Sequence, residues 1–111
     1  MTTSTTPPQR PAPQMGDIPI RVGTLPHELT EARTVLAQYR AESRQPVIFV
    51  IYDHPTDYPH HVVVRPWHGL APSRHVILAD TIGLARAALP QGLTAIARHP
   101  DDDPKIIGMY L

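Results

Sequence analysis

The chain of 111 residues contains no cysteine, so disulfide bonds and thiolate chemistry are excluded. It has no excess of either charge, because ten basic residues balance ten acidic ones and the formal net charge is zero. A nucleic-acid-binding domain needs a basic face that displaces counterions from the phosphates. The sequence therefore argues against nucleic acid as the main partner.

Long apolar runs are also missing. The longest run, Val47–Tyr52, has the length of a strand, whereas a membrane-spanning helix needs about 20 apolar residues. The first residues lack the positive and apolar stretches of a secretory signal. We therefore expect a cytoplasmic protein that has no membrane partner.

Proline is abundant near the N-terminus, where it occupies positions 7, 8, 11 and 13 among Thr, Ser, Gln, Arg and Ala. Such a segment cannot bury enough apolar surface to offset its loss of conformational entropy. We predict a disordered tail over residues 1–16. Residues 17–111 then form a single domain, with a core over residues 47–111.

The clearest helix is predicted over Thr24–Arg44. Its apolar residues recur at spacings of three and four, which places these side chains on one helical face: Leu29, Ala32, Val35, Leu36 and Tyr39. Thr24 is suited to cap the N-terminus of this helix, and Pro46 ends the helical segment. A second and shorter helix is predicted over Ile82–Leu89.

Strands are predicted where β-branched and aromatic residues gather. Val47–Asp53 lacks polar alternation, so both of its faces should be covered, as in a central strand. Asp17–Gly23 alternates like a strand but contains Pro19, which lacks an N–H donor and suits a sheet edge. The remaining predicted strands are His61–Pro66, His75–Ala79, Leu93–Arg98 and Lys105–Leu111.

Together these elements predict an α+β fold of two layers. Their order is α-β-β-β-α-β-β, with a further strand before the first helix if Asp17–Gly23 pairs. Short connections favour hairpins, so the five-stranded sheet should be mostly antiparallel. Both helices should cover one face of that sheet.

Histidines form the most conspicuous group of reactive side chains. Five of the seven lie between positions 54 and 75. Imidazole and carboxylate groups are usual ligands of Zn²⁺, so a metal-dependent hydrolase or nuclease is one hypothesis. Its candidate ligands match no known ligand spacing; they are Asp53, His54, Asp57, His60 and His61.

Other catalytic patterns are absent from the sequence. Ser73 could meet His75 and Asp80, but no nucleophile elbow presents the serine. The six glycines are scattered singly and form no phosphate-binding loop. The sequence therefore favours a function without catalysis, and we predict neither a catalytic residue nor a cofactor.

A binding surface is predicted around the single tryptophan, because Trp and Arg are enriched at the energetic centres of protein interfaces. It would lie at one end of the sheet, and its candidate residues are Asp53, His54, Asp57, Arg65, Trp67 and His68. Two alternatives stay open. Trp67 could instead close the core, or it could stack on bases together with Arg65 and Arg74 in a weak nucleic-acid-binding module.

The second half of the chain resembles a family of small bacterial proteins that also occur in phages and other mobile elements. The resemblance begins at Val50 and rests on segments that include Tyr52–Pro59, Val64–Trp67, Ala79–Thr81 and Pro100–Ile106. No activity is established for that family, so the resemblance implies a compact domain. An origin in mobile elements also favours a protein that modulates a host or phage machine.

The function that we predict from the sequence is a non-catalytic interaction module, which binds a protein partner and self-associates as a homodimer. We expect self-association because the terminal strand Lys105–Leu111 would lie at an exposed sheet edge. Strands of a second copy can pair with such an edge. The metal-dependent hydrolase or nuclease and the nucleic-acid-binding module are the alternatives.

Overall fold

The computed structural model describes residues 16–111, so the predicted tail lies outside the described residues except for Gly16. The described part is an α+β domain with its elements in the order β1 (Ile18–Val22), α1 (Pro26–Glu42), β2 (Val47–Asp53), β3 (Val62–His68), β4 (Ala71–Pro72), β5 (His75–Ala79), α2 (Ile82–Ala87) and β6 (Ile106–Tyr110). Among these residues, no helix combines the length and the apolar character that crossing a bilayer requires.

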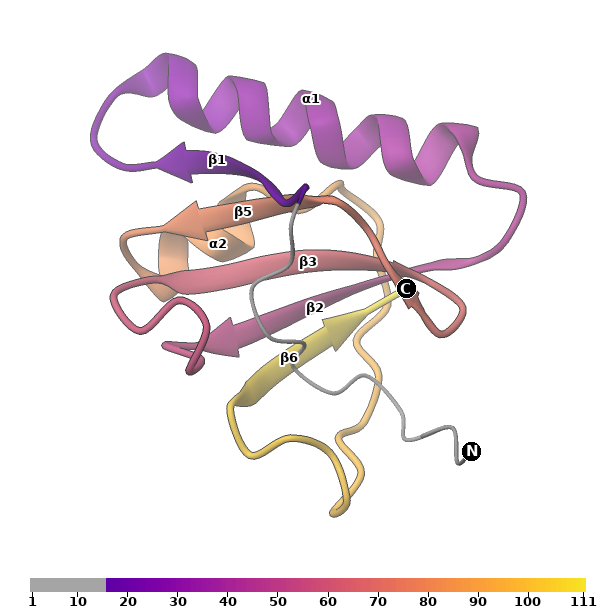
Figure 1. Ribbon diagram of the computed structural model, residues 1–111. Coiled ribbons are helices and arrows are strands. Elements are labelled where there is room, and N and C mark those ends of the chain that lie inside the picture. Colours follow the sequence, from indigo (N-terminus) through magenta and orange to yellow (C-terminus); the bar gives the residue numbers. More distant parts are fainter. Residues whose placement is uncertain (1–15) are drawn as a thin grey trace.

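The strands form one mixed sheet in the order β1-β5-β3-β2-β6, and β4 extends β3 as a short hairpin (Figure 1). β1 and β5 run parallel, whereas the other neighbours run antiparallel. The predicted α+β class is confirmed, and β2 is the interior strand that its apolar run indicated. The predicted five-stranded order is not matched, because β1 joins the sheet as a parallel edge strand.

The segment Leu93–Arg98 is not the strand that we predicted. Within it, Ala95 makes a single bridge to Tyr110 of β6. Backbone hydrogen bonds of 2.8–2.9 Å join Thr94 and Ile96 to the last residues of the chain. This short pairing covers the outer edge of β6 at its C-terminal end, around Met109 and Leu111, and self-association through the rest of this edge stays a prediction.

The opposite edge of the sheet, at β1, is also poorly suited to strand addition. The backbone groups of Ile18 and Val22 bond toward the β5 side. Alternation along the strand therefore directs the backbone groups of Pro19 and Arg21 outward. Because proline has no N–H, Arg21 supplies the only outward donor within β1, which fits the predicted edge position of Pro19.

Helix α1 begins two residues later than predicted. Pro26 occupies its first position, where a missing N–H costs nothing. Thr24 does not cap the helix; instead the Glu28 carboxylate accepts hydrogen bonds from the backbone N–H groups of Gly23 at 3.0 Å and Leu25 at 3.4 Å. Glu28 thus satisfies donors at the positive end of the helix.

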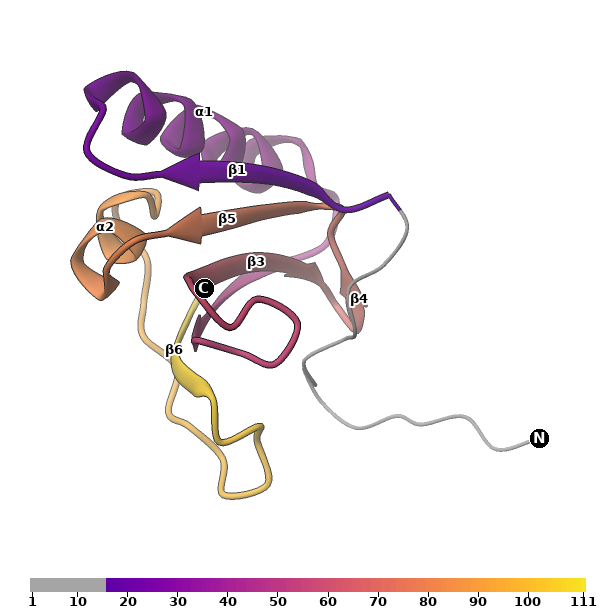
Figure 2. The same cartoon turned by 60° about the vertical axis from the view of Figure 1, so that its left-hand side comes forward.

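Both helices pack on one face of the sheet, as the sequence predicted. Figure 1 views the sheet from the face away from the helices, so α2 lies behind β5. Figure 2 shows the same arrangement turned about the vertical axis. Ala32 and Leu36 of α1 and Ala85 of α2 are fully buried against this face. The helix-face cluster also contains strand residues such as Val22, Phe49, Ile51, Val64 and Ile77.

A second apolar cluster lies on the face away from the helices. Its members come from alternate positions of the same strands and include Val50, Tyr52, Val63, Trp67, Val76 and Met109. The loop between β2 and β3 folds over this cluster through Tyr58. Because β2 contributes to both clusters, its uninterrupted apolar sequence is explained.

Candidate functional site

The structure does not bring the predicted binding surface together. In the β2–β3 hairpin, Asp53 pairs with Val62 and His68 pairs with Val47. Asp53 and His68 therefore lie at opposite ends of the hairpin. Alternation along β3 separates the remaining candidates as well, because Trp67 joins the cluster on the far face while His68 contacts α1.

Arg65 is buried and ion-paired. It is 2% exposed, and its guanidinium donates to the Asp17 carboxylate at 3.0 and 3.3 Å and to the Ser73 carbonyl at 2.9 Å. The Tyr58 hydroxyl donates to the same carboxylate at 2.8 Å. This network joins the start of β1, strand β3 and the β2–β3 loop, so Arg65 has a structural role here.

Trp67 is 6% exposed and closes the far-face cluster. Neither its indole N–H nor the hydroxyl of neighbouring Tyr52 has a hydrogen-bond partner of acceptable geometry among the described residues. With Trp67 and Arg65 both buried, the surface proposed for base stacking is not formed. Arg74 is exposed, but its Nε donates to the Gly16 carbonyl at 3.2 Å.

The buried phenol of Tyr52 and the partly buried phenol of Tyr58 predict a specific response to alkali. Burial raises the pKa of Tyr52 above its ordinary value of 10.0, and the nearby Trp67 side chain and Arg65 charge oppose that rise. Burial and the hydrogen bond to Asp17 raise the pKa of Tyr58 as well. The contribution of the two neutral phenols to the free energy of unfolding is therefore fully present below pH 10. It is lost as the pH rises through their higher pKa values in the folded state.

We expect Tyr52→Phe to reduce this alkaline loss of stability. At neutral pH the variant should unfold with an unchanged free energy, or with one about 1 kcal/mol higher, because it removes an unpartnered buried hydroxyl. Urea denaturation at neutral and alkaline pH measures both effects. A loss of more than about 1 kcal/mol at neutral pH would show that the hydroxyl makes a stabilising hydrogen bond.

The predicted metal ligands do not form a site. His54 Nδ1 lies 2.7 Å from Asp53 Oδ1, but both side chains are about half exposed, at 48% and 46%. His60 is exposed on the same loop. Within residues 16–111, no group of three or more His, Asp or Glu side chains is placed to hold a metal ion. The described residues therefore give the metal-dependent hydrolase or nuclease no geometric support.

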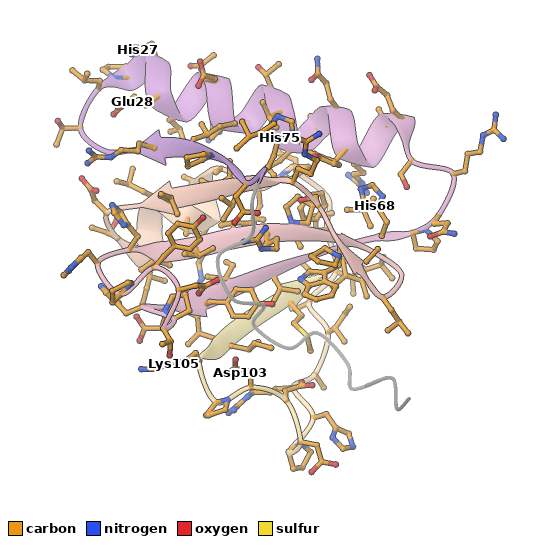
Figure 3. The ribbon with its side chains drawn as sticks, viewed as in Figure 1. His27, Glu28, His68, His75, Asp103 and Lys105 are labelled. Carbon is orange, nitrogen blue, oxygen red and sulfur yellow. The ribbon has the colours of Figure 1, made fainter. Side chains whose placement is uncertain are left out.

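A pocket lined mostly by residues with polar groups lies instead between the C-terminal half of α1 and the sheet. Figure 3 shows His75 and His68 on the α1 side of the sheet, with His68 near the end of the helix. We call this cavity of about 370 Å³ the two-histidine pocket; it is lined by Val35, Gln38, Tyr39, Glu42, Ser43, His68 and His75.

Hydrogen bonds define the state of His68. The Ser43 hydroxyl donates its only proton to the Gln45 carbonyl at 2.7 Å. His68 Nδ1 lies 3.0 Å from the same hydroxyl oxygen, so with the serine proton on the carbonyl it is assigned as the donor. In the neutral ring this places the unprotonated nitrogen at Nε2, which accepts no hydrogen bond from the described residues.

Tyr39 holds the two imidazoles in place. Its hydroxyl and His75 Nδ1 share a short hydrogen bond of 2.6 Å. Its ring centroid lies 5.3 Å from that of His68 in a tilted arrangement and 5.5 Å from that of His75 in an edge-to-face arrangement. These are favourable geometries for aromatic pairs, so the three rings form an ordered wall of the pocket.

Neither nearby serine is arranged as a nucleophile. Catalysis would require the serine proton to be held by an imidazole nitrogen. The Ser43 proton is held by a backbone carbonyl, and the Ser73 hydroxyl likewise donates to the backbone carbonyl of His75 at 2.8 Å. Ser73, His75 and Asp80 therefore do not form a catalytic triad.

A second surface feature lies on the α2 side of α1. Two adjoining hollows of about 570 and 490 Å³, which share the lining residues Arg33, Leu89, Pro90 and Gln91, make up this depression. We call this depression the arginine groove, because Arg40 and Arg86 also line it. None of the described residues that line either hollow is acidic.

The arginines from α1 are fixed by the end of α2. Arg33 Nε donates to the Ala87 carbonyl at 2.7 Å, and Arg40 Nη1 donates to the Gln91 carbonyl at 2.8 Å. Carbonyls at a helix C-terminus carry partial negative charge, so the contact of Arg33 with Ala87 stabilises α2, whereas Arg40 holds the segment that follows the helix. Each guanidinium keeps further N–H donors for a ligand, because arginine has five.

The sequence contains a signal for the arginine groove and one for the two-histidine pocket, although neither site was predicted. Arg33 and Arg40 are seven residues apart, which places them on the same side of a helix. Tyr39 and Ser43 are four residues apart and likewise share a side. The position of α1 on the sheet, which the sequence alone does not determine, decides which strand ends these residues meet.

Comparisons of the chain with models of protein families, with curated proteins and with solved structures gave no match.

Proposed function

We propose that the protein is a non-catalytic interaction module that binds an acidic segment of a protein partner in the arginine groove. The observation that carries this proposal is the gathering of Arg33, Arg40 and Arg86 along one depression that has no acidic lining residue. In a chain of zero net charge, such a local excess favours an anionic partner over a neutral one.

The groove is suited to a peptide in shape as well as charge. Ala37 and Ala41 are exposed small residues of α1 that line it, so a partner backbone can approach the helix closely. Hydrogen bonds to the Ala87 carbonyl in α2 and to the Gln91 carbonyl after it hold Arg33 and Arg40 in place before binding. Less side-chain entropy is therefore lost when a carboxylate pairs with them.

Nucleic acid is a weaker candidate for the same groove. Three guanidinium groups neutralise few phosphates, and affinity for nucleic acid depends on that number. Arg65 and Trp67, the pair expected to stack on bases, are buried on the other side of the sheet. A groove that binds carboxylates by bidentate contacts needs no stacking surface.

Arg86 provides the cleanest test, because it is exposed and its side chain makes no hydrogen bond among the described residues. We expect Arg86→Glu to weaken binding of a fluorescent Glu-rich peptide about tenfold or more, as measured by anisotropy. Arg44→Glu makes the same change in net charge at an exposed site outside the groove, and it should weaken binding much less.

Three results would overturn the proposal. These are no saturable binding of the acidic peptide, equal effects of the two charge reversals, or tighter binding of single-stranded DNA than of the peptide at the same salt concentration. Circular dichroism of each variant establishes that the fold is retained.

A further inference from the structure

The two-histidine pocket lies on the flank of α1 opposite the arginine groove. The helix repeats every 3.6 residues, so two sets of positions offset by half a turn face different sides. The pocket uses Val35, Gln38, Tyr39 and Glu42, and the groove uses Arg33, Ala37, Arg40 and Ala41. The two features are therefore separate, and a ligand of one need not contact the other.

The pocket has a negative and acceptor-rich lining. Among the described residues that line it, Glu42 is the one with a formal charge at neutral pH when both histidines are neutral. The unprotonated Nε2 of His68 is a second acceptor, because Nδ1 already donates to Ser43. Gln38 adds an amide oxygen. This chemistry complements a ligand that is positively charged and rich in N–H donors.

The pocket also has an aromatic wall. Tyr39 lies between the rings of His68 and His75 at centroid distances of 5.3 and 5.5 Å. Cations bind favourably over the face of a tyrosine ring. An aromatic wall beside a carboxylate is therefore an arrangement that favours cations on two independent grounds.

We propose that the two-histidine pocket binds a small organic cation that carries N–H donors, such as a primary ammonium group. Its N–H groups donate to the Glu42 carboxylate and to His68 Nε2, while its alkyl part packs against Val35 and the Tyr39 ring. The cavity of about 370 Å³ falls in the size range of small-molecule sites.

Other ligand classes fit less well. An anion would meet the Glu42 carboxylate and the acceptor nitrogen of His68, both of which repel it. A transition-metal ion needs three or more ligands, and residues 16–111 contain no such arrangement. A quaternary ammonium could use the aromatic wall but has no N–H to donate, so it should bind more weakly than a primary one.

The test uses propylammonium chloride as the probe and the imidazole NMR signals of His68 and His75 as the readout. The signals are assigned from the variants His68→Gln and His75→Gln. We expect saturable shifts of both signals with a dissociation constant on the order of 1 mM, as suits a ligand of few atoms. Glu42→Gln should weaken binding about tenfold, because it removes the charge but keeps the side-chain shape.

Matched controls separate this site from unspecific attraction. Glu31→Gln makes the same change at an exposed α1 position outside the pocket and should leave the affinity unchanged. Propanol, which lacks the charge, and tetramethylammonium, which lacks N–H donors, should both bind more weakly. Shifts that do not saturate, equal effects of the two glutamate variants, or tighter binding of propanol or acetate would each overturn the proposal.

Discussion

Replacing Arg65 by alanine is expected to lower the free energy of unfolding by about 3–5 kcal/mol, because removing one partner of a buried ion pair leaves the other charge uncompensated. The Arg65 and Asp17 side chains are 3% and 9% exposed, so the carboxylate has little contact with bulk water that would compensate for the lost guanidinium. Without Arg65, the buried carboxylate would keep the Tyr58 hydroxyl as one remaining donor. The Ser73 carbonyl would lose its hydrogen bond as well.

A double-mutant cycle isolates the pair from its surroundings. In an Asp17→Ala background, Arg65→Ala should cost much less, because no carboxylate is then left uncompensated. Arg44→Ala serves as the exposed control and should change stability by less than about 0.5 kcal/mol. A loss of less than about 1 kcal/mol for Arg65→Ala in urea denaturation would show that the pair contributes no more than an ion pair at the surface.

Arg65 also illustrates what sequence patterns leave open. Beside Trp67 and His68 it has the composition of an interface, but the same sequence also allows the tryptophan to close the core. Alternation along β3 decides between these readings, because it directs Arg65 and Trp67 to one face and His68 to the other. The partner of Arg65 lies 48 positions away, and no local pattern indicates such a contact.

The local elements of the fold were predictable, because each depends on residues close together in the chain. The apolar stripe of α1 and the β-branched run of β2 place their elements within two residues of the observed bounds. Segment Leu93–Arg98 had the composition of a strand, but it makes only one bridge, to the end of β6. Composition does not show whether a partner strand runs beside the whole segment.

The order of the strands was not predictable from local patterns. β1 pairs with β5 in parallel, although α1 and three strands lie between them in the sequence. Hairpin reasoning applies only to neighbours in the chain, so it predicted the antiparallel pairs but not this parallel one. The same long-range pairing brings His75, at the start of β5, beneath the C-terminal half of α1 and so creates one wall of the two-histidine pocket.

Helix α1 carries residues of both proposed sites, yet it lies before Val50, where the family resemblance predicted from the sequence would begin. Two roles of the helix are then conceivable. It is either an integral part of the folding unit or an appendage on a sheet that folds without it. The burial of Leu36, which is 0% exposed within the helix-face cluster, favours an integral helix.

Leu36→Ala is therefore expected to lower the free energy of unfolding of the whole domain by about 2–5 kcal/mol, in a single transition. The sheet beneath Leu36 is held by strand pairing on both sides and cannot collapse into the cavity. Leu70→Ala deletes the same atoms where the side chain is 67% exposed and should cost less than about 0.5 kcal/mol. If Leu36→Ala melted the helix while the sheet unfolded at its original urea concentration, α1 would be an appendage, and the arginine groove and two-histidine pocket would exist only while it is docked.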